Sequence, residues 1–218
     1  MPPMRKMKDE KGEMKSFRVN DIFYSLQGEG RNTGRAAIFI RFAGCNLRCS
    51  FCDTEFDSYR EMTTDDIITA IAPYPARFVV LTGGEPTLQA DEAFVDQLHQ
   101  HGYEVAMESN GTRPAPRNLD WLTISPKPAH ITNITHLPHD ISLTPHEIKI
   151  IFDGITNPED LLSQFAPFPP KKPLLYLQPC DTGHAEQNAR LLHECIDYIK
   201  THPQWRLSLQ THKLIDIK

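Results

Sequence analysis

Three of the five cysteines in this chain lie in one short segment, at Cys45, Cys49 and Cys52. Iron–sulfur clusters are held by cysteine thiolates, and a cubic 4Fe–4S cluster normally takes four of them. Three thiolates would bind three irons and leave the fourth iron open to a small molecule. A cluster that only carries electrons more often has a full set of protein ligands. The spacing therefore predicts a cluster whose open iron takes part in chemistry.

A structural zinc site is the alternative for these thiols, because Zn²⁺ also takes cysteine ligands and Asp53 or a histidine could complete a tetrahedron. Such zinc sites usually pair two C-x2-C elements, and this chain has one. The spacing favours the cluster. Of the other two cysteines, Cys195 adjoins an apolar helix stripe and is expected to be buried. Cys180 follows a strand and has no assigned role.

A glycine pair follows a predicted strand further along the chain, where residues 82–86 read Thr-Gly-Gly-Glu-Pro. Two glycines let the backbone approach a ligand closely and leave its N–H and C=O groups free to bind. Taken alone, the pair is as typical of a tight turn as of a ligand loop.

The elements that must position these motifs alternate between short apolar runs and helical patterns, which favours an α/β fold with parallel strands. We expect strands at Ala37–Phe42, Phe78–Leu81, Val105–Glu108, Leu122–Ile124, Ile148–Phe152, Leu174–Leu177 and Arg206–Leu209. We expect helices at Thr64–Ala72, Asp91–His101, Pro158–Phe165 and Ala185–Lys200. The last helix has an apolar stripe of Ala185, Ala189, Leu192, Ile196 and Ile199 at helical spacing.

Polar clusters follow six of these strands at their carboxyl ends. They are the cysteine loop, the glycine pair, Glu108 with Asn110, Ser125 with Lys127, Gln178, and His212. The carboxyl ends of parallel strands meet at one edge, where α/β barrels and open sheets gather their ligands. An active site at that edge would explain why all six polar clusters follow strand ends.

Length and composition set limits on the class of protein. The 218 residues suit a single domain, which we expect over residues 17–218, after a mobile charged tail at 1–16. A net charge of −5 without a long basic block gives no reason to expect a nucleic-acid partner. The sequence shows no apolar run long enough for a membrane span and no secretory signal, so we expect a cytoplasmic protein with reduced cysteines.

Taken together, the cysteine spacing and the GGEP-type loop resemble the radical S-adenosylmethionine (SAM) superfamily. Further segments are similar to the 7-carboxy-7-deazaguanine synthase family within it: SLQGEG at 25–30, IFIR at 38–41, CDT at 52–54, ESNGT at 108–112, SPK at 125–127 and QTHK at 210–213. The resemblance runs from Asn20 to the C-terminus and is loose around 128–145. It implies a partial, open (β/α) barrel. It also implies a carbon–nitrogen lyase that converts 6-carboxy-5,6,7,8-tetrahydropterin to 7-carboxy-7-deazaguanine with loss of ammonia, on the route to queuosine and other deazapurines.

The resemblance also implies site residues at matching positions of this sequence. Cys45, Cys49 and Cys52 would hold the 4Fe–4S cluster, and Thr54 would be a Mg²⁺ ligand. SAM would meet Phe51, Cys52, Asp53, Gly84, Ser125, Pro126, Lys127 and Gln178. The pterin would meet Leu26, Gln27, Gly28, Glu29, Arg41, Thr82, Glu108, His212 and the C-terminal Lys218. Arg41 is expected to pair with the substrate carboxylate, because a guanidinium fork matches that group.

Family resemblance further implies a flavodoxin-like electron donor and a homodimer. The sequence leaves two other interpretations of the function open. A glycyl-radical-enzyme activase is another small radical SAM enzyme with the same cysteine spacing, but it would act on a protein backbone. A zinc-stabilised binding module would have no catalytic activity.

Overall fold

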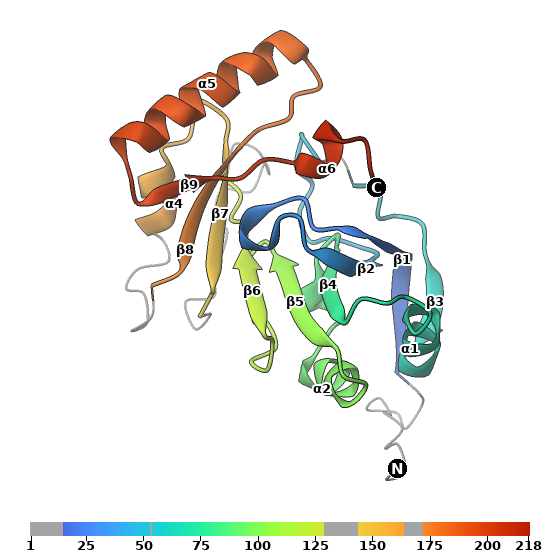
Figure 1. Ribbon diagram of the computed structural model, residues 1–218. Helices are drawn as coiled ribbons and strands as arrows, with labels where there is room; N and C mark the ends of the chain where they lie inside the picture. The colour runs from blue at the N-terminus through green and yellow to red at the C-terminus, as the bar shows by residue number, and fades with distance from the viewer. Residues whose placement is uncertain (1–14, 53, 129–143, 164–171) are drawn as a thin grey trace.

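The computed structural model describes residues 15–52, 54–128, 144–163 and 172–218 of the chain (Figure 1). The strands are β1 (Ser16–Leu26), β2 (Ala36–Phe42), β3 (Arg60–Thr63), β4 (Phe78–Gly83), β5 (Glu104–Ser109), β6 (Trp121–Ile124), β7 (Glu147–Phe152), β8 (Leu174–Pro179) and β9 (Trp205–Leu207). The α-helices are α1 (Thr64–Ile71), α2 (Glu92–Gln100), α4 (Pro158–Ser163), α5 (Ala185–Thr201) and α6 (Thr211–Leu214). Two short 3₁₀ turns lie at Gly30–Asn32 and Pro86–Leu88.

These strands form one sheet in the order β3-β1-β2-β4-β5-β6-β7-β8-β9. From β2 to β9 neighbouring strands are parallel, whereas β1 is antiparallel to both β2 and β3. The order ends at β3 and β9, so the sheet curls without closing (Figure 1). The expected partial, open (β/α) barrel is confirmed.

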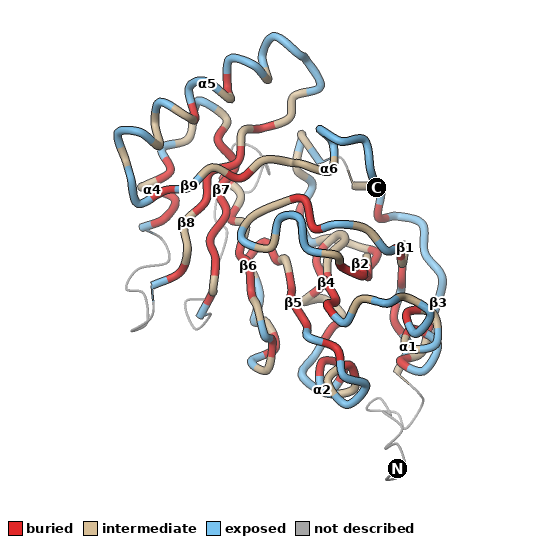
Figure 2. The backbone as a smooth tube through the Cα atoms, viewed as in Figure 1, coloured by how far each residue is buried: buried red, intermediate tan, exposed pale blue. Residues whose placement is uncertain are grey.

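Alternation along the strands separates two apolar layers. In β2, Ile38, Ile40 and Phe42 face the main core, under the helices on the outside of the sheet. Phe39 belongs to a second cluster, together with Phe23 from β1. The two layers account for the buried stretches of strand in Figure 2. Because successive side chains point to opposite faces, a polar residue next to a core residue is directed into the barrel.

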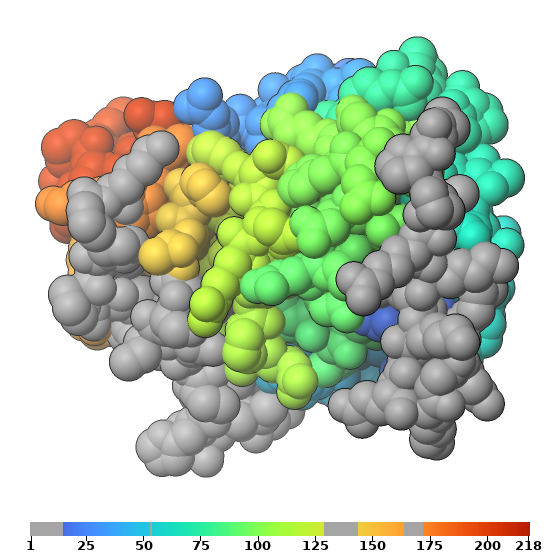
Figure 3. Space-filling model, turned by 90° about the horizontal axis from the view of Figure 1, so that it is seen from below, coloured from blue at the N-terminus to red at the C-terminus, as the bar shows by residue number. Residues whose placement is uncertain are grey.

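The carboxyl ends of the parallel strands point to the upper side of Figure 1, where the β1–β2 connection and α6 also lie. Seen from the opposite side, α2 and its neighbouring segments form the middle of the surface, in green (Figure 3). No helix among the described residues is long and apolar enough to cross a membrane.

All seven expected strands are present, but the sequence reading missed β1 and β3. The pairing of β1 with β2 is irregular between Val19 and Asp21. Phe17 and Val19 face the main core before this point, and Ile22 packs against the same core after it. A bulge changes which positions point inward, so it breaks the period of two that identifies a strand.

The boundary expected for the N-terminal tail also needs correction. Ser16 already belongs to β1 and is paired with Thr63, and the Lys15 ammonium lies 2.5 Å from the Asp91 carboxylate. Lys15 and Ser16 therefore belong to the folded domain and not to a tail. The rest of the expected tail, residues 1–14, lies outside the described part of the chain.

The buried face of α5 differs from the apolar stripe that the sequence predicts. Its buried residues are Leu191 and Cys195, whereas Ala185 and Ala189 are exposed. The helix packs against β8 and β9, and Ile199 of the expected stripe is partly buried against the main core. The expectation for Cys195 is confirmed: it is fully buried, and burial raises the pKa of its thiol to about 12.

Candidate active site

A cavity of about 420 Å³ opens at the carboxyl ends of the parallel strands. Residues from β2, β4, β5, β7 and β8 line it, together with the cysteine loop, the β1–β2 connection and the C-terminal segment. The strand ends therefore meet at one site, as the six polar clusters predicted.

The cysteine loop forms part of the wall of this cavity, which all three thiols line. Cys45 and Cys49 are partly buried and Cys52 is exposed. The backbone N–H of Leu47 donates to Cys45 Sγ at 3.4 Å. Burial raises the pKa of both Cys45 and Cys49, and the nearby charge of Lys127 opposes this rise at Cys49. Iron binding would deprotonate the thiols, and a donor set of three thiols on one wall fits a cluster with an open iron.

The described residues contain no group of three or more His, Cys, Asp or Glu side chains arranged to hold a single metal ion.

The glycine pair after β4 packs directly on the start of the cysteine loop. A Cβ atom on Gly84 would lie 2.0 Å from the carbonyl oxygen of Gly44. The N–H of Gly84 donates to the carbonyl of Phe42 at 3.0 Å. The buried Glu85 carboxylate accepts from the Ser109 hydroxyl at 2.9 Å and from the Asn110 N–H at 2.8 Å. These contacts join the ends of β2, β4 and β5 at the cavity.

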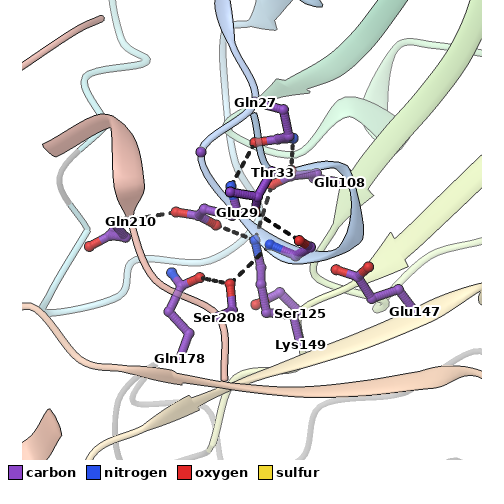
Figure 4. Close-up of polar contacts among 12 residues, drawn as sticks. Gln27, Glu29, Thr33, Glu108, Ser125, Glu147, Lys149, Gln178, Ser208 and Gln210 are labelled. Carbon is purple, nitrogen blue, oxygen red and sulfur yellow. Dashed lines mark hydrogen bonds and ion pairs between the residues drawn. The ribbon is translucent and has the colours of Figure 1, made fainter. Parts of the chain in front are cut away.

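A network of charged side chains lies on another side of the cavity, with Lys149 buried and Glu29 and Glu108 partly buried (Figure 4). The Lys149 ammonium forms an ion pair with Glu29 and lies 3.5 Å from Glu108 Oε2. The Gln27 side chain donates to Glu108 Oε1 at 2.8 Å and accepts from the Glu29 N–H at 3.2 Å. Gln210 donates to Glu29 Oε1 at 3.1 Å.

The electrostatics of this network depend on Lys149. Burial opposes ionisation of Glu29, but the charge and hydrogen bond of Lys149 lower its pKa to about 2. Burial likewise disfavours the charged form of Lys149, and the charges of Glu108 and Glu29 outweigh it and raise the pKa of its ammonium group. Lys149 therefore favours the ionised form of Glu29, and Glu29 favours the ionised form of Lys149.

A third glutamate, Glu147, lies behind this network and is also buried. The N–H of Arg31 donates to Glu147 Oε2 at 3.0 Å, but burial dominates and raises the pKa of the carboxyl to about 7. Gly30, at φ +62°, fits closely here, since a Cβ atom would lie 2.0 Å from Glu147 Oε1.

Two cations lie over one aromatic ring where β1 and β2 border the cavity. The Arg41 guanidinium is 4.9 Å from the centre of the Phe23 ring, and the Lys218 ammonium is 4.8 Å from it. Lys218 also lies 2.5 Å from Asp21. Arg41 lines the cavity, where its guanidinium can pair with an anionic group.

On the β6 and β8 side, Lys127 donates to the Ser125 hydroxyl at 2.5 Å and to the Ser125 carbonyl at 3.0 Å. Burial lowers the pKa of Lys127. Gln178 is buried and accepts from the Ser208 hydroxyl at 2.9 Å. Its amide is thereby fixed in orientation at the cavity wall.

The comparisons with known proteins agree with this geometry. Residues 39–131 match the Radical SAM superfamily model. The 7-carboxy-7-deazaguanine synthase of Bacteroides thetaiotaomicron is 46% identical over 92% of this chain and 98% of that protein. The enzyme of the same name from Bradyrhizobium diazoefficiens is 38% identical over 93% of this chain and 100% of that protein.

The chain belongs to the 7-carboxy-7-deazaguanine synthase family. The crystal structure of QueE from Escherichia coli superposes with a TM-score of 0.75 at 29% identity, and the match covers 89% of this chain and 93% of that one.

The cavity gathers nearly all the positions expected from the resemblance to this synthase family. They are Leu26, Gln27, Gly28, Glu29, Arg41, Cys45, Cys49, Phe51, Cys52, Thr54, Thr82, Gly84, Glu108, Ser125, Lys127, Gln178, His212 and Lys218. Pro126 is buried and is not part of the lining, and Asp53 lies outside the described residues. Cys180, which had no assigned role, is buried and also lines the cavity.

Sequence reasoning missed Lys149 and Glu147 in this member of the synthase family. Both lie on β7, and Ile148, Ile150 and Phe152 face the main core from the alternate positions. The available signal was a Glu and a Lys two residues apart inside an otherwise apolar strand. Such spacing places both side chains on the inner face of the barrel.

Proposed function

We propose that this chain is a radical SAM lyase that converts 6-carboxy-5,6,7,8-tetrahydropterin to 7-carboxy-7-deazaguanine with release of ammonia. The observation that carries the proposal is that one cavity is lined both by three cysteine thiols and by the family's pterin-side residues. The sequence match to enzymes of that name over nearly the whole chain supports it.

Cys45, Cys49 and Cys52 would hold a 4Fe–4S cluster, and the cavity wall beside it would hold SAM. When bound, the cluster and SAM supply the one-electron chemistry that starts the reaction. Gly84, Ser125, Lys127 and Gln178 lie where they can bind SAM by backbone and side-chain polar groups. Phe51 and Cys52 contribute the adjoining loop backbone.

The pterin would lie between Arg41 and the partly buried Glu29 and Glu108. The Arg41 guanidinium can pair bidentately with the substrate carboxylate. The Glu108 carboxylate can accept hydrogen bonds from the 2-amino and ring N–H groups of the pterin. Gln27, Thr82 and His212 line the same space and restrict the orientation of the ring. Enclosing the substrate in this way also excludes water from a reactive intermediate.

Three further parts of the proposal concern partners and location. Thr54 lines the cavity and would be a Mg²⁺ ligand, which is compatible with a metal that keeps several waters. The electron donor would be a flavodoxin-like protein, and the reducing cytoplasm would be the compartment. A homodimer would form, and the exposed Leu214 at the end of α6 and Ile215 after it provide apolar surface for a contact.

The deciding experiment is an anaerobic assay of the reconstituted protein with SAM, a reductant, Mg²⁺ and authentic carboxypterin. We expect one 7-carboxy-7-deazaguanine and one ammonia per pterin consumed, identified by ultraviolet absorbance and mass. Cys49→Ala should lose this activity while remaining folded. Cys195→Ala, which removes a thiol far from the cavity, should retain it. Iron-loaded protein that cleaves SAM but leaves the carboxypterin unchanged would reject the proposal and favour a glycyl-radical-enzyme activase.

A further inference from the structure

Lys149 occupies an unusual position for a lysine. It lies on the parallel strand β7, only 3% of its surface is exposed, and it is directed into the cavity. A buried ammonium group is costly unless it is paired and hydrogen-bonded. The strand gains nothing from this residue that an aliphatic side chain would not supply. A role in the cavity would explain why a lysine is buried at this position.

The contacts of Lys149 join segments that are distant in the sequence (Figure 4). Its ammonium group contacts Glu29, in the β1–β2 connection, and Glu108, in β5. Gln27 links these two glutamates from the opposite side, through the Glu108 carboxylate and the Glu29 N–H. The four residues form a closed ring of hydrogen bonds and ion pairs at the cavity. Within the ring, Lys149 is the cation shared by both carboxylates.

The other charged groups near the ring do not replace Lys149. On β7 itself Glu147 adds a further carboxyl, whose pKa burial raises to about 7, so it is only partly ionised near neutral pH. Lys127, after β6, interacts with Glu29 and Glu108 only at longer range, and it contacts Ser125 instead. His212, in the C-terminal segment, makes the smallest of the contributions that favour the ionised form of Glu29.

We infer that Lys149 is a positioning residue for the pterin: it keeps Glu29 ionised and holds the Glu29 and Glu108 carboxylates in place as hydrogen-bond acceptors for the substrate's N–H groups. The inference rests on the proposed function. An ionised carboxylate only accepts hydrogen bonds, whereas a protonated one presents an O–H that would face the substrate's own donors. Without the cation, the low-polarity surroundings of Glu29 would favour its protonated form.

The test compares pterin binding by wild-type protein and Lys149→Met, because methionine keeps the length of the side chain without its charge. Anaerobic titration calorimetry with carboxypterin is run on cluster-loaded protein with SAM and without reductant, from pH 6.5 to 9. We expect the Kd of Lys149→Met to be raised about tenfold or more at pH 6.5. The ratio to wild type should fall as the pH rises, because higher pH restores the ionised carboxylate of Glu29. Lys200→Met, which changes an exposed lysine paired with Asp197, should bind like wild type throughout.

Two results would overturn the inference. One is a Kd within twofold of wild type at every pH, and the other is a Kd raised by the same factor at every pH. The second result would show a structural defect without any change in ionisation. If wild-type protein itself fails to bind carboxypterin, the proposed function fails instead, so the two failures are distinguishable.

Folding provides a second readout that does not depend on binding. Glu29→Gln combined with Lys149→Met removes one partly buried carboxylate together with its cation. We expect the double variant to melt at a higher temperature than Lys149→Met alone, or to fold where the single variant does not. A double variant that melts no higher than the single one would show that charge compensation is not the role of Lys149.

Discussion

Gly84 and Gly44 are in direct backbone contact at the mouth of the cysteine loop. A Cβ atom on Gly84 would lie 2.0 Å from the Gly44 carbonyl oxygen, and the adjacent Glu85 N–H donates to that oxygen at 2.9 Å. The glycine turn after β4 therefore supports the loop that carries the three thiols. This contact links the two motifs that identify the superfamily.

Substituting Gly84 should disturb the cysteine loop even though no ligand residue is changed. Because the obstructing atoms are backbone, Gly84→Ala must displace the loop, at a cost of about 1–3 kcal/mol. We expect iron content after anaerobic reconstitution to fall by at least about half at that cost. Gly102→Ala is the control: a Cβ atom there would meet no atom within 4 Å, and the φ of +78° gives this substitution a backbone cost that Gly84→Ala does not have. Equal iron content in Gly84→Ala and wild type would contradict the supporting role.

Loss of the Arg41 guanidinium should weaken substrate binding specifically. Arg41→Ala is expected to reduce the free energy of pterin binding by about 1.5–3 kcal/mol, the scale of a hydrogen bond to a charged group. The measurement is the Kd of carboxypterin, with SAM cleavage in its absence as a check on the cofactor site. Arg35→Ala removes a surface arginine that pairs with Glu104, and it should leave the Kd unchanged. An unaltered Kd in Arg41→Ala would remove this residue from the substrate site.

The C-terminus should contribute to substrate affinity, because Ile217 and Lys218 both line the cavity. Deleting residues 214–218 removes the Lys218 ammonium from beside Phe23 and opens that side of the cavity. We expect a raised KM for the pterin. Leu214→Ala changes an exposed side chain within the deleted segment and should keep the wild-type KM. Kinetics of the truncated chain that match wild type would show that the C-terminus is dispensable.

Glu147 should make stability depend on pH in a defined window. Its folded-state pKa of about 7 lies above the ordinary value of 4.5, so the folded protein holds this proton more tightly than the unfolded chain. The resulting stabilisation is fully present below pH 4.5 and is lost as the pH rises through about 7.

Glu147→Gln cannot ionise and should lose this dependence. Relative to wild type, the variant should gain about 1–3 kcal/mol in unfolding free energy between pH 5 and pH 8. Anaerobic urea unfolding of both proteins at the two pH values measures the difference. A constant difference between the two proteins would show that Glu147 does not titrate in this window.

Local patterns predicted much of the site, because they depend on residue type and short spacing. The trio Cys45, Cys49 and Cys52 indicates a cluster loop from one segment alone. Parallel strands ending in polar residues predicted that distant clusters would meet, since parallel strands share one edge. The cavity contains members of all six clusters.

The tertiary structure decided what depends on contacts between distant segments. The bulge in β1 reverses the inward positions, and the packing of α5 on β8 and β9 selects Leu191 and Cys195 over the expected stripe. Lys149 is adjacent in sequence only to apolar residues of β7, and its partners Glu29 and Glu108 come from other parts of the barrel. A lysine in an apolar strand indicates that the folded protein must supply an oppositely charged partner. Only the curvature of the sheet determines which carboxylates approach it, because burial and charge pairing are properties of the assembled fold.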